Sequence, residues 1–419
     1  MTDTPEMIWA TAWIGAAQGP YPAGNPSAQP DQRFAFPDPA TGARDQSFRL
    51  ILRPDIWGRA ARLRFSNVMG SRPLTIAGVH AGLQDAGSGV VPGTNRAVHF
   101  NGAASITIAP GAMAWSDAVD LPFAADPDNA LLRGRRMAVS FHVVGESGPM
   151  TWHAKALATS YVTPPGAGAH GAADHSDAFA LTTASWFFLD ALDMRVPAGT
   201  RVVVCLGDSI TDGTLAAMNA DDRYPDVLSR RVHARFGNKV AVINAGIGGN
   251  QVASPPRHDI NNPLNGGASA LERLQRDVLD LSAVAAVIWF EGINDLGING
   301  SEPAQVIAGL REGVARMRAA IPGVRIIGAT ITSTVGAARH HGHPIVETRR
   351  QEINKFLRGT DLFDAVADFD RATLDPASGD LRAEMQPDGV IGGEGDKVHP
   401  NHAGYLAMGF AVDLDTLLP

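Results

Sequence analysis

The residues Val202-Val203-Val204-Cys205-Leu206 run directly into Gly207-Asp208-Ser209-Ile210-Thr211-Asp212-Gly213, and this stretch decides the fold. The apolar run is short and shows no polar alternation, which is typical of a buried parallel strand. The glycines and polar residues behind it predict a turn that enters a helix. In an open α/β sheet, ligands gather beyond the carboxyl ends of the strands. Ser209 therefore lies where chemistry is expected, beside backbone N–H groups that point toward an incoming oxyanion.

Four more apolar runs follow and predict further parallel strands. They are residues 240–243, 284–290, 324–329 and 365–368. Between these runs, apolar residues recur at three- and four-residue spacing, which indicates amphipathic helices. The clearest of these helices begins near Ser301-Glu302-Pro303, a capping sequence with proline in the first turn. Its apolar stripe consists of Ile307, Leu310, Val314, Met317 and Ile321. Strand–helix alternation of this kind predicts a doubly wound α/β fold with a five-stranded parallel sheet.

The first ~195 residues show a different pattern, in which short stretches alternate apolar with polar residues between turn formers. Residues 47–52, 61–66, 104–108 and 137–142 are examples. Alternation of this kind is typical of half-buried antiparallel strands and predicts an all-β, jelly-roll-like sandwich. The pattern changes at Pro197-Ala198-Gly199-Thr200. We therefore expect an accessory β-sandwich domain over residues 1–198 and a catalytic domain over residues 199–419.

Composition excludes several classes of protein. The 419 residues carry a formal net charge of −8 and no Lys/Arg run, which argues against a nucleic-acid partner. Cys205 is the only cysteine in the sequence, so no intrachain disulfide forms, and its apolar neighbours predict a buried thiol. No stretch has the apolar length of a membrane span. Without a signal peptide in the chain as given, we expect a cytoplasmic protein, or a secreted or periplasmic one if a leader precedes it.

Three further polar segments stand where chemistry is expected. The second predicted strand ends in Asn244-Ala245-Gly246-Ile247-Gly248-Gly249-Asn250, and the third ends in Glu291-Gly292-Ile293-Asn294-Asp295. Glycines let the backbone approach a substrate closely, and Asn294 supplies an amide donor. Near the C-terminus comes Asp396-Lys397-Val398-His399-Pro400-Asn401. A spacing of three residues requires Asp396 and His399 to come from one loop or one helical turn.

These four segments, in this order, closely resemble the SGNH (GDSL) hydrolase superfamily over the second half of the chain. Gly207-Asp208-Ser209 matches the nucleophile block and Gly249 the glycine of the second block. Gly292 and Asn294 match the Gly-x-Asn-Asp block, and Asp396 with His399 the Asp-x-x-His block. Gly248 stands where many relatives have serine, which leaves the donor role of the Gly249 backbone intact. The first half is similar to the β-sandwich of a two-domain bacterial subgroup, through residues 62–67 and 186–189.

The resemblance implies a serine esterase without a metal or another cofactor. Ser209 would be the nucleophile, and His399 the base that accepts its proton and later protonates the leaving alcohol. Asp396 would hold the imidazole tautomer and offset its transient charge. The oxyanion would be met by the N–H groups of Ser209 and Gly249 and by the Asn294 side chain.

Each of these residues also has a purely structural interpretation. Ser209 and Asp396 could be helix or turn caps, Asn294 an Asx-turn residue, and His399 a surface residue before a proline. The aspartates beside the blocks (Asp208, Asp212 and Asp295) are expected to structure loops rather than to catalyse. His340, His341 and His343 invite a metal interpretation, but they lack a carboxylate or thiolate at ligand spacing. They predict a solvated loop near the rim of the active site instead.

Three functions remain open on the sequence alone, two of them enzymatic and the third from another class. The first is an esterase for short acyl groups, acetyl above all, on a small-molecule or carbohydrate alcohol. The second is an acyltransferase that forms the same acyl-enzyme and passes the acyl group to an alcohol or amine. The third is a non-catalytic carbohydrate-binding protein, whose usual mark, a missing catalytic residue, is not seen here. No oligomeric state is predicted.

Overall fold

The computed structural model describes residues 6–22, 30–253, 266–338, 340–387 and 395–418. The chain divides into two compact units. One unit contains Met1–Thr200 and Gly237–Ala241, and the other contains Arg201–Phe236 and Val242–Pro419. Antiparallel strands give way to parallel strands between β15 (Leu189–Pro197) and β16 (Arg201–Gly207). The domain boundary between residues 198 and 199 stays a prediction.

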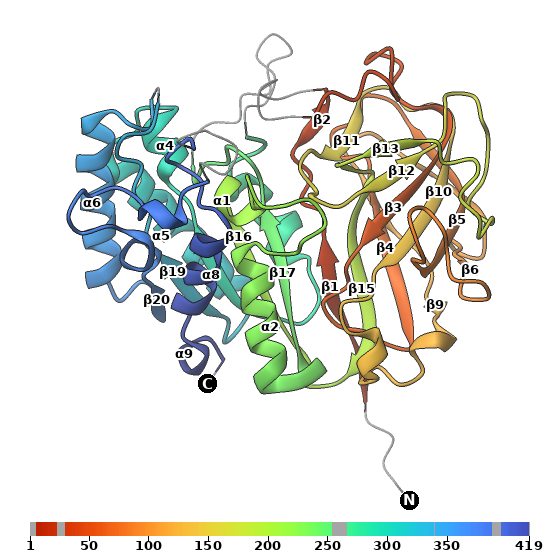
Figure 1. Cartoon of the computed structure of the whole chain (residues 1–419). Helices are drawn as coiled ribbons and strands as arrows, with labels where there is room; N and C mark the ends of the chain where they lie inside the picture. Colours follow the sequence, from red (N-terminus) through yellow and green to blue (C-terminus); the bar gives the residue numbers. More distant parts are fainter. Residues whose placement is uncertain (1–5, 23–29, 254–265, 339, 388–394, 419) are drawn as a thin grey trace, which may run out of the picture. The chain divides into compact units, whose positions relative to one another are not determined.

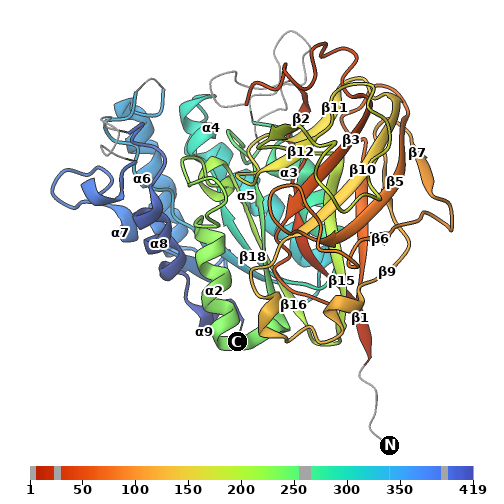
Figure 2. The ribbon, with the colours of Figure 1, turned by 45° about the vertical axis from the view of Figure 1, so that its right-hand side comes forward.

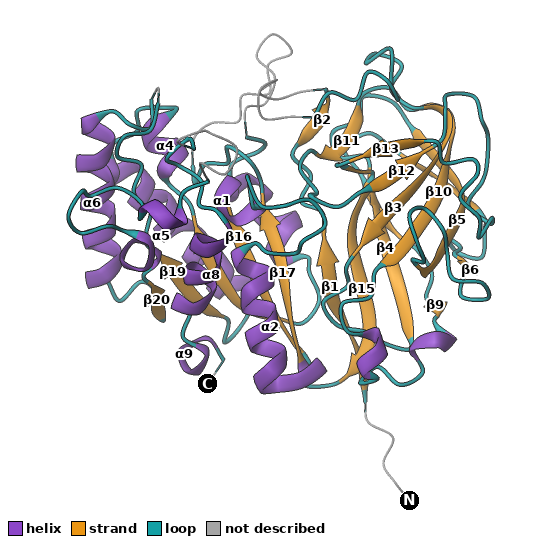
Figure 3. Ribbon diagram, viewed as in Figure 1, coloured by secondary structure: helices purple, strands orange, loops and turns teal. Residues whose placement is uncertain are grey.

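The first unit is β-rich, and its described strands pair in antiparallel sheets (Figures 1 and 3). One large sheet has the order β13-β12-β3-β10-β5-β6 with β7 beside β5, and another has the order β1-β15-β4-β8 with β9 beside β4. A small sheet has the order β14-β11-β2. The strands of this unit other than β15 are β1 (Met7–Ile14), β2 (Gly19–Tyr21), β3 (Arg44–Leu52), β4 (Ala60–Ser66), β5 (Leu74–Leu83), β6 (Arg96–Ala97), β7 (Ser105–Ile108), β8 (Met113–Trp115), β9 (Val119–Asp120), β10 (Met137–Glu146), β11 (Met150–His153), β12 (Ser160–Val162), β13 (Leu181–Thr183) and β14 (Trp186–Phe187).

Phe141 packs against one aromatic ring of its own sheet and against one of the other large sheet. The Phe141 ring of β10 stacks on Phe48 of β3 with ring centroids 5.1 Å apart. The same ring meets Phe65 of β4 edge to face at 5.2 Å. Aromatic pairs in these geometries contribute beyond the area they bury. Because β4 belongs to the other large sheet, this contact confirms the predicted β-sandwich.

The expected half-burial of β3 and β10 is wrong, since both faces of these strands are covered over most of their length. Segment 164–179 covers the face on which their polar residues lie. Ser47 Oγ donates to the carbonyl oxygen of Gly168 at 2.7 Å. Arg49 donates to the carbonyl oxygen of Ala173 at 2.5 Å and to Ser140 Oγ at 2.8 Å. The alternation is real, but its polar positions are satisfied by buried hydrogen bonds rather than by water.

The second unit contains the parallel sheet predicted for it. Its order is β17-β16-β18-β19-β20, and the strands from β16 through β18 and β19 to β20 pair in parallel. The four strands after β16 are β17 (Val240–Gly246), β18 (Val284–Phe290), β19 (Arg325–Ala329) and β20 (Ala365–Ala367). This flavodoxin-like order places the topological switch point between β16 and β18, where ligands bind in doubly wound folds. The predicted fold class is confirmed.

Helices in the second unit fall into two packed groups. Helix α2 packs against α8, and α7 against α8 as well, while α3 packs against α5 and α5 against α6. Figures 1 and 2 both show α2 and α8 side by side. The α-helices are α1 (Ser209–Asp212), α2 (Tyr224–Phe236), α3 (Ala270–Leu274), α4 (Ile293–Gly297), α5 (Pro303–Ala320), α6 (Pro344–Gly359), α7 (Phe369–Thr373), α8 (His402–Ala411) and α9 (Leu414–Leu417). Helix α5 begins as predicted, with Glu302 in a capping box and Pro303 in the first turn. No helix in the described part of the chain is both long and apolar enough to cross a membrane.

Candidate active site

Ser209 occupies the first position of the short helix α1, directly after strand β16. The preceding residue, Asp208, caps the helix by accepting the Ile210 N–H at 2.9 Å. Gly213 ends the helix with φ of 97°, a backbone conformation that favours glycine. Because the strand is followed at once by the cap and the serine, the Ser209 hydroxyl lies at the carboxyl edge of the sheet. Ser209 is 7% exposed, so its surroundings are largely shielded from water.

The side chains of Ser209, His399 and Asp396 form a continuous hydrogen-bonded chain. His399 Nε2 lies 2.7 Å from Ser209 Oγ, and His399 Nδ1 lies 2.5 Å from Asp396 Oδ2. An ionised carboxylate only accepts, so Nδ1 carries the proton and Nε2 is free to accept one from the serine hydroxyl. Burial alone would raise the pKa of Asp396, but the hydrogen bond and charge of His399 outweigh it and lower that pKa to about 2. The carboxylate is thus ionised across the neutral range.

The loop that carries Asp396 and His399 is organised by Asp396 itself. Its Oδ1 accepts the backbone N–H groups of Val398 at 3.0 Å and His399 at 2.9 Å. Lys397 has φ of 58° and its ammonium group lies 3.3 Å from Asp380 Oδ2. This tight turn explains how a spacing of three residues brings the carboxylate and the imidazole of one segment into contact.

Gly249 lies in a turn after β17 that requires glycine. Its φ is 80°, and the turn closes through a hydrogen bond of 3.1 Å from the Asn250 N–H to the carbonyl oxygen of Ile247. A residue with a side chain is strained at that φ. The Ile247 N–H also donates to the carbonyl oxygen of Gly207 at 3.0 Å, which ties this turn to the segment that enters Ser209.

Asn294 lies in the short helix α4 after β18, and its side chain connects two loops. Its Nδ2 donates to the carbonyl oxygen of Asn250 at 2.9 Å. The neighbouring Asp295 accepts the Val252 N–H at 2.9 Å, which further anchors the segment behind Gly249. The three segments predicted to supply oxyanion donors are therefore joined to one another by hydrogen bonds at one edge of the sheet.

A buried arginine of α3, Arg273, forms hydrogen bonds to several of these segments. Arg273 donates to the carbonyl oxygen of Gly207 at 2.9 Å, to that of Ala245 at 2.7 Å and to Asn250 Oδ1 at 2.8 Å. It also pairs with Asp277 at 3.1 Å and with Glu291 at 3.4 Å, and its side chain is fully buried. The guanidinium fork suits this task because it offers five donors in a fixed plane.

Two carboxyl groups next to this arginine have raised pKa values. Burial raises the pKa of Glu291 to about 7, against the opposing charge of Arg273. Burial also raises the pKa of Asp208 well above its usual range, with the nearby charges of Glu291 and Asp295 adding to the effect. Low dielectric surroundings penalise the charged form of a carboxyl group, so such groups hold their protons to higher pH.

Sequence reasoning missed two residues that contact this arrangement, Arg273 and His341. Arg273 had a signal, because it stands four residues before Asp277 on the buried side of a helix, where an isolated charge would be costly. His341 was expected in a solvated loop, and that expectation is wrong. Its ring is half-buried, and its Nε2 lies 3.0 Å from Asn294 Oδ1. Nothing in the local sequence indicates this contact, because 47 residues separate the two partners.

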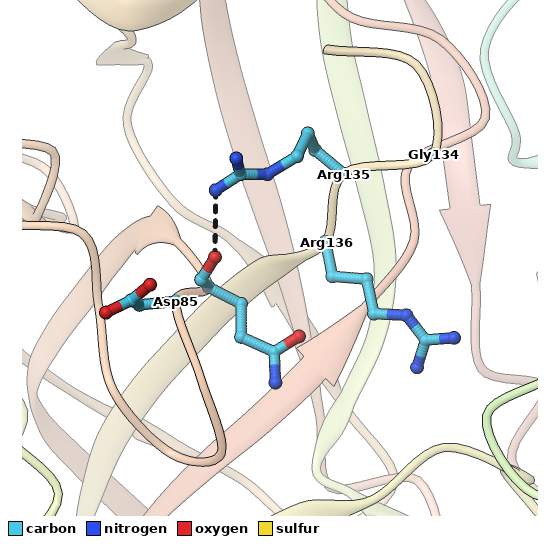
Figure 4. Close-up of a pocket in the computed structure, with 5 residues that line it drawn as sticks. Asp85, Gly134, Arg135 and Arg136 are labelled. Carbon is cyan, nitrogen blue, oxygen red and sulfur yellow. Dashed lines mark hydrogen bonds between the residues drawn. The ribbon is translucent and has the colours of Figure 1, made fainter. Parts of the chain in front are cut away.

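A separate hollow of about 310 Å³ lies in the first unit (Figure 4). Gln84, Asp85, Gly134, Arg135 and Arg136 line it. Arg135 donates to the carbonyl oxygen of Gln84 at 3.0 Å, as the dashed line in Figure 4 marks. The lining contains no serine, cysteine or histidine, so it offers neither a nucleophile nor an imidazole base for acyl transfer.

A serine at the switch point of a doubly wound sheet, bonded to a histidine and an aspartate, is the arrangement of an α/β serine hydrolase. Residues 205–407, which include Ser209, Asp396 and His399, match the GDSL-like Lipase/Acylhydrolase family. The chain thus carries a domain of that family and is a hydrolase.

Solved structures resemble about half of the chain. They include a carbohydrate acetylesterase family member from Sinorhizobium meliloti (19% identity, 50% of this chain and 94% of that one, TM-score 0.37). A lipolytic protein of the G-D-S-L family from Veillonella parvula has 19% identity over 50% of this chain and 95% of its own, with a TM-score of 0.35. The lipase/acylhydrolase from Enterococcus faecalis has 23% identity over 50% of this chain and 92% of its own, with a TM-score of 0.34. Among curated proteins none matches the chain.

Proposed function

We propose that residues 199–419 form the catalytic domain of an esterase that cleaves short acyl esters through an acyl-enzyme on Ser209. The observation that carries the proposal is the unbroken chain of hydrogen bonds from Ser209 Oγ through His399 to Asp396, 2.7 Å and 2.5 Å long. A serine hydroxyl is a poor nucleophile until a neighbouring base accepts its proton, and the imidazole is within reach of that proton.

In the first half of the reaction, Ser209 Oγ attacks the ester carbonyl carbon while its proton passes to His399 Nε2. The N–H groups of Ser209 and Gly249 and an N–H of Asn294 stabilise the negative oxygen of the tetrahedral intermediate. The intermediate then collapses, the bond from carbon to the alcohol oxygen breaks, and His399 Nε2 returns its proton to the leaving alcohol. The acyl group stays on Ser209.

In the second half, water attacks the acyl carbon and gives its proton to His399 Nε2. The bond to Ser209 Oγ breaks, the carboxylic acid leaves, and the serine recovers its proton from the imidazole. Asp396 accepts the Nδ1 hydrogen throughout and offsets the positive charge of the imidazolium. No step requires a metal ion or another cofactor.

The substrate class rests on analogy with the family. A short acyl group, acetyl first, fits the resemblance of the sequence, and the β-sandwich of residues 1–198 favours a carbohydrate as the alcohol. Hydrolysis of p-nitrophenyl esters of increasing chain length, beside acetylated sugars and oligosaccharides, would define both parts of the substrate. Product analysis with a competing sugar or alcohol separates hydrolysis, which yields free acid alone, from acyl transfer.

The test of the nucleophile is hydrolysis of p-nitrophenyl acetate by Ser209→Ala. We expect kcat to fall on the order of a million-fold or to the limit of detection, as loss of a triad serine does elsewhere. Ser71→Ala, at an exposed turn of the first unit, is the matched control and should keep wild-type turnover. Near-normal turnover by Ser209→Ala would remove Ser209 from the mechanism.

A further inference from the structure

The side-chain amide of Asn294 is held at both ends. Its Nδ2 donates to the carbonyl oxygen of Asn250 at 2.9 Å, and its Oδ1 lies 3.0 Å from His341 Nε2. An amide nitrogen carries two N–H groups, so the bond to Asn250 leaves one N–H for a substrate oxygen. Which end of the amide faces the substrate depends on these two contacts.

The contact between Asn294 and His341 specifies a tautomer. An amide oxygen only accepts hydrogen bonds, so His341 Nε2 carries the hydrogen in this arrangement. Burial, together with the nearby His399 and His340 rings, lowers the pKa of His341 to about 4. The ring is therefore neutral above that pH, protonated at Nε2 and unprotonated at Nδ1.

Rotation of the Asn294 amide by half a turn would break both contacts. Its Oδ1 would then face the carbonyl oxygen of Asn250, and its N–H groups would face the Nε2 hydrogen of His341. The first encounter opposes two acceptors, and the second opposes two donors as long as the ring keeps its hydrogen on Nε2. A rotated amide would also place its oxygen beside the negative oxygen of the intermediate. Among the contacts of the described residues, only the one to Asn250 would oppose this rotation without His341.

The position of the His341 ring is prepared by the residues around it. Thr334 Oγ1 donates to the backbone carbonyl oxygen of His341 at 2.9 Å, which holds the turn that carries the ring. The ring lies against Gly297, where an added Cβ would stand 2.5 Å from His341 Cδ2. Gly297 follows Asn294 by three residues and so lies on the same side of α4. A larger residue there would displace the ring from the amide that it contacts.

We propose that His341 is a positioning residue that fixes the amide of Asn294 with an N–H, and not the carbonyl oxygen, toward the substrate. The inference rests on the proposed function, because it matters only where Asn294 stabilises an oxyanion. His341 itself donates no proton to the substrate and does not touch the reacting atoms.

The first test compares His341→Leu with His341→Gln on p-nitrophenyl acetate. Leucine fills similar space without a donor, and kcat should fall roughly 10- to 100-fold with little change in KM, less than loss of the oxyanion donor itself. Glutamine can place an N–H close to the position of Nε2 and should recover most of the lost kcat. His340→Leu, at the exposed neighbouring position, should keep wild-type turnover. Wild-type kcat in His341→Leu, or no recovery with glutamine, would overturn the inference.

The second test places His341→Leu in an Asn294→Ala background. If His341 acts through Asn294, the second substitution should cost no further activity, whereas an independent structural role would multiply the two losses. A multiplied loss, or an Asn294→Ala variant as active as wild type, would overturn the inference.

A third variant, Gly297→Ala, leaves His341 in the chain but displaces its ring, and it serves if His341→Leu fails to fold. It should lower kcat to a similar extent as His341→Leu, and wild-type kcat in folded Gly297→Ala would count against the inference. The proposed function is judged separately, by Ser209→Ala. If that variant is inactive and His341→Leu keeps full activity, the inference alone is wrong. If Ser209→Ala stays active, the proposed function is wrong.

Discussion

The two carboxylate oxygens of Asp396 accept hydrogen bonds from different partners, one from the backbone of its own loop and the other from the His399 imidazole. Oδ1 accepts the two backbone N–H groups of Val398 and His399, and Oδ2 accepts the Nδ1 hydrogen of His399. A single carboxylate thus orients the ring and selects the tautomer in which Nε2 can accept the Ser209 proton. The conventional interpretation of Asp396 as a turn cap is correct, but it describes only one of the two oxygens.

The substitution Asp396→Asn separates these two contributions. The asparagine oxygen can still accept the backbone N–H groups, while its NH₂ group faces Nδ1 and forces the hydrogen onto Nε2. We expect kcat to fall roughly 1,000- to 10,000-fold, because the ring then holds the wrong tautomer. Circular dichroism should show an intact fold, and Asp126→Asn, at an exposed turn of the first unit, should leave steady-state kinetics unchanged. Turnover within tenfold of wild type would contradict the role of Asp396.

The buried Glu291 carboxyl group makes the free energy of unfolding depend on pH. Its folded pKa of about 7 exceeds the ordinary value of 4.5, so the folded chain holds this proton more tightly than the unfolded chain does. The resulting stabilisation is complete below about pH 4.5 and disappears as the pH rises through about 7. Its size is on the order of 3 kcal/mol.

Glu291→Gln should remove this part of the pH dependence. Urea unfolding at about pH 5 and about pH 8 would measure it, since the wild type should lose more unfolding free energy between these two conditions than the variant loses. The difference between the two proteins reports the titration of Glu291 together with the effect of its charge on Asp208. Equal pH dependence in wild type and variant would show that Glu291 does not titrate in this range.

At the scale of secondary structure, Arg273 connects the ends of two strands with the loop behind the second. The Arg273 side chain donates hydrogen bonds to the carbonyl oxygen of the last residue of β16, to that of Ala245 in β17 and to the side chain of Asn250. The sheet order puts β16 in the middle of this part of the sheet, with β17 and β18 on either side. Strand ends that carry the candidate site are thereby held by one buried group instead of by loop contacts alone.

Arg273→Met should therefore lower the free energy of unfolding by about 3–5 kcal/mol, because Asp277 and Glu291 lose a buried partner. Urea denaturation measures this value directly. The control is Arg371→Met, whose side chain is 76% exposed and pairs with Asp368 at 3.4 Å. An exposed pair of this kind contributes less than about 1 kcal/mol. A loss of similar size in both variants would refute the structural role of Arg273.

For the whole molecule, features that depend on neighbouring residues can be predicted from the sequence, and contacts between residues far apart in the sequence cannot. The strands of the parallel sheet are predicted because each is a contiguous apolar run, and the site segments because each follows such a run. The pairing order in the β-sandwich is not predicted, since alternation alone does not tell which strands are neighbours. Buried polar contacts such as Arg49 with Ala173, or His341 with Asn294, join residues far apart in sequence and leave no local pattern.

The central claim, that Ser209 is the activated nucleophile of an ester hydrolase, is tested most directly by covalent labelling. A fluorophosphonate reacts with an activated serine, and mass spectrometry of the digested protein locates the label. We predict loss of ester hydrolysis in proportion to labelling, one label per chain on the peptide that contains Ser209, and no label in Ser209→Ala. His399→Ala should label far more slowly, because the base is absent. A label on another residue, or full hydrolysis by a protein that resists the reagent, would contradict the account.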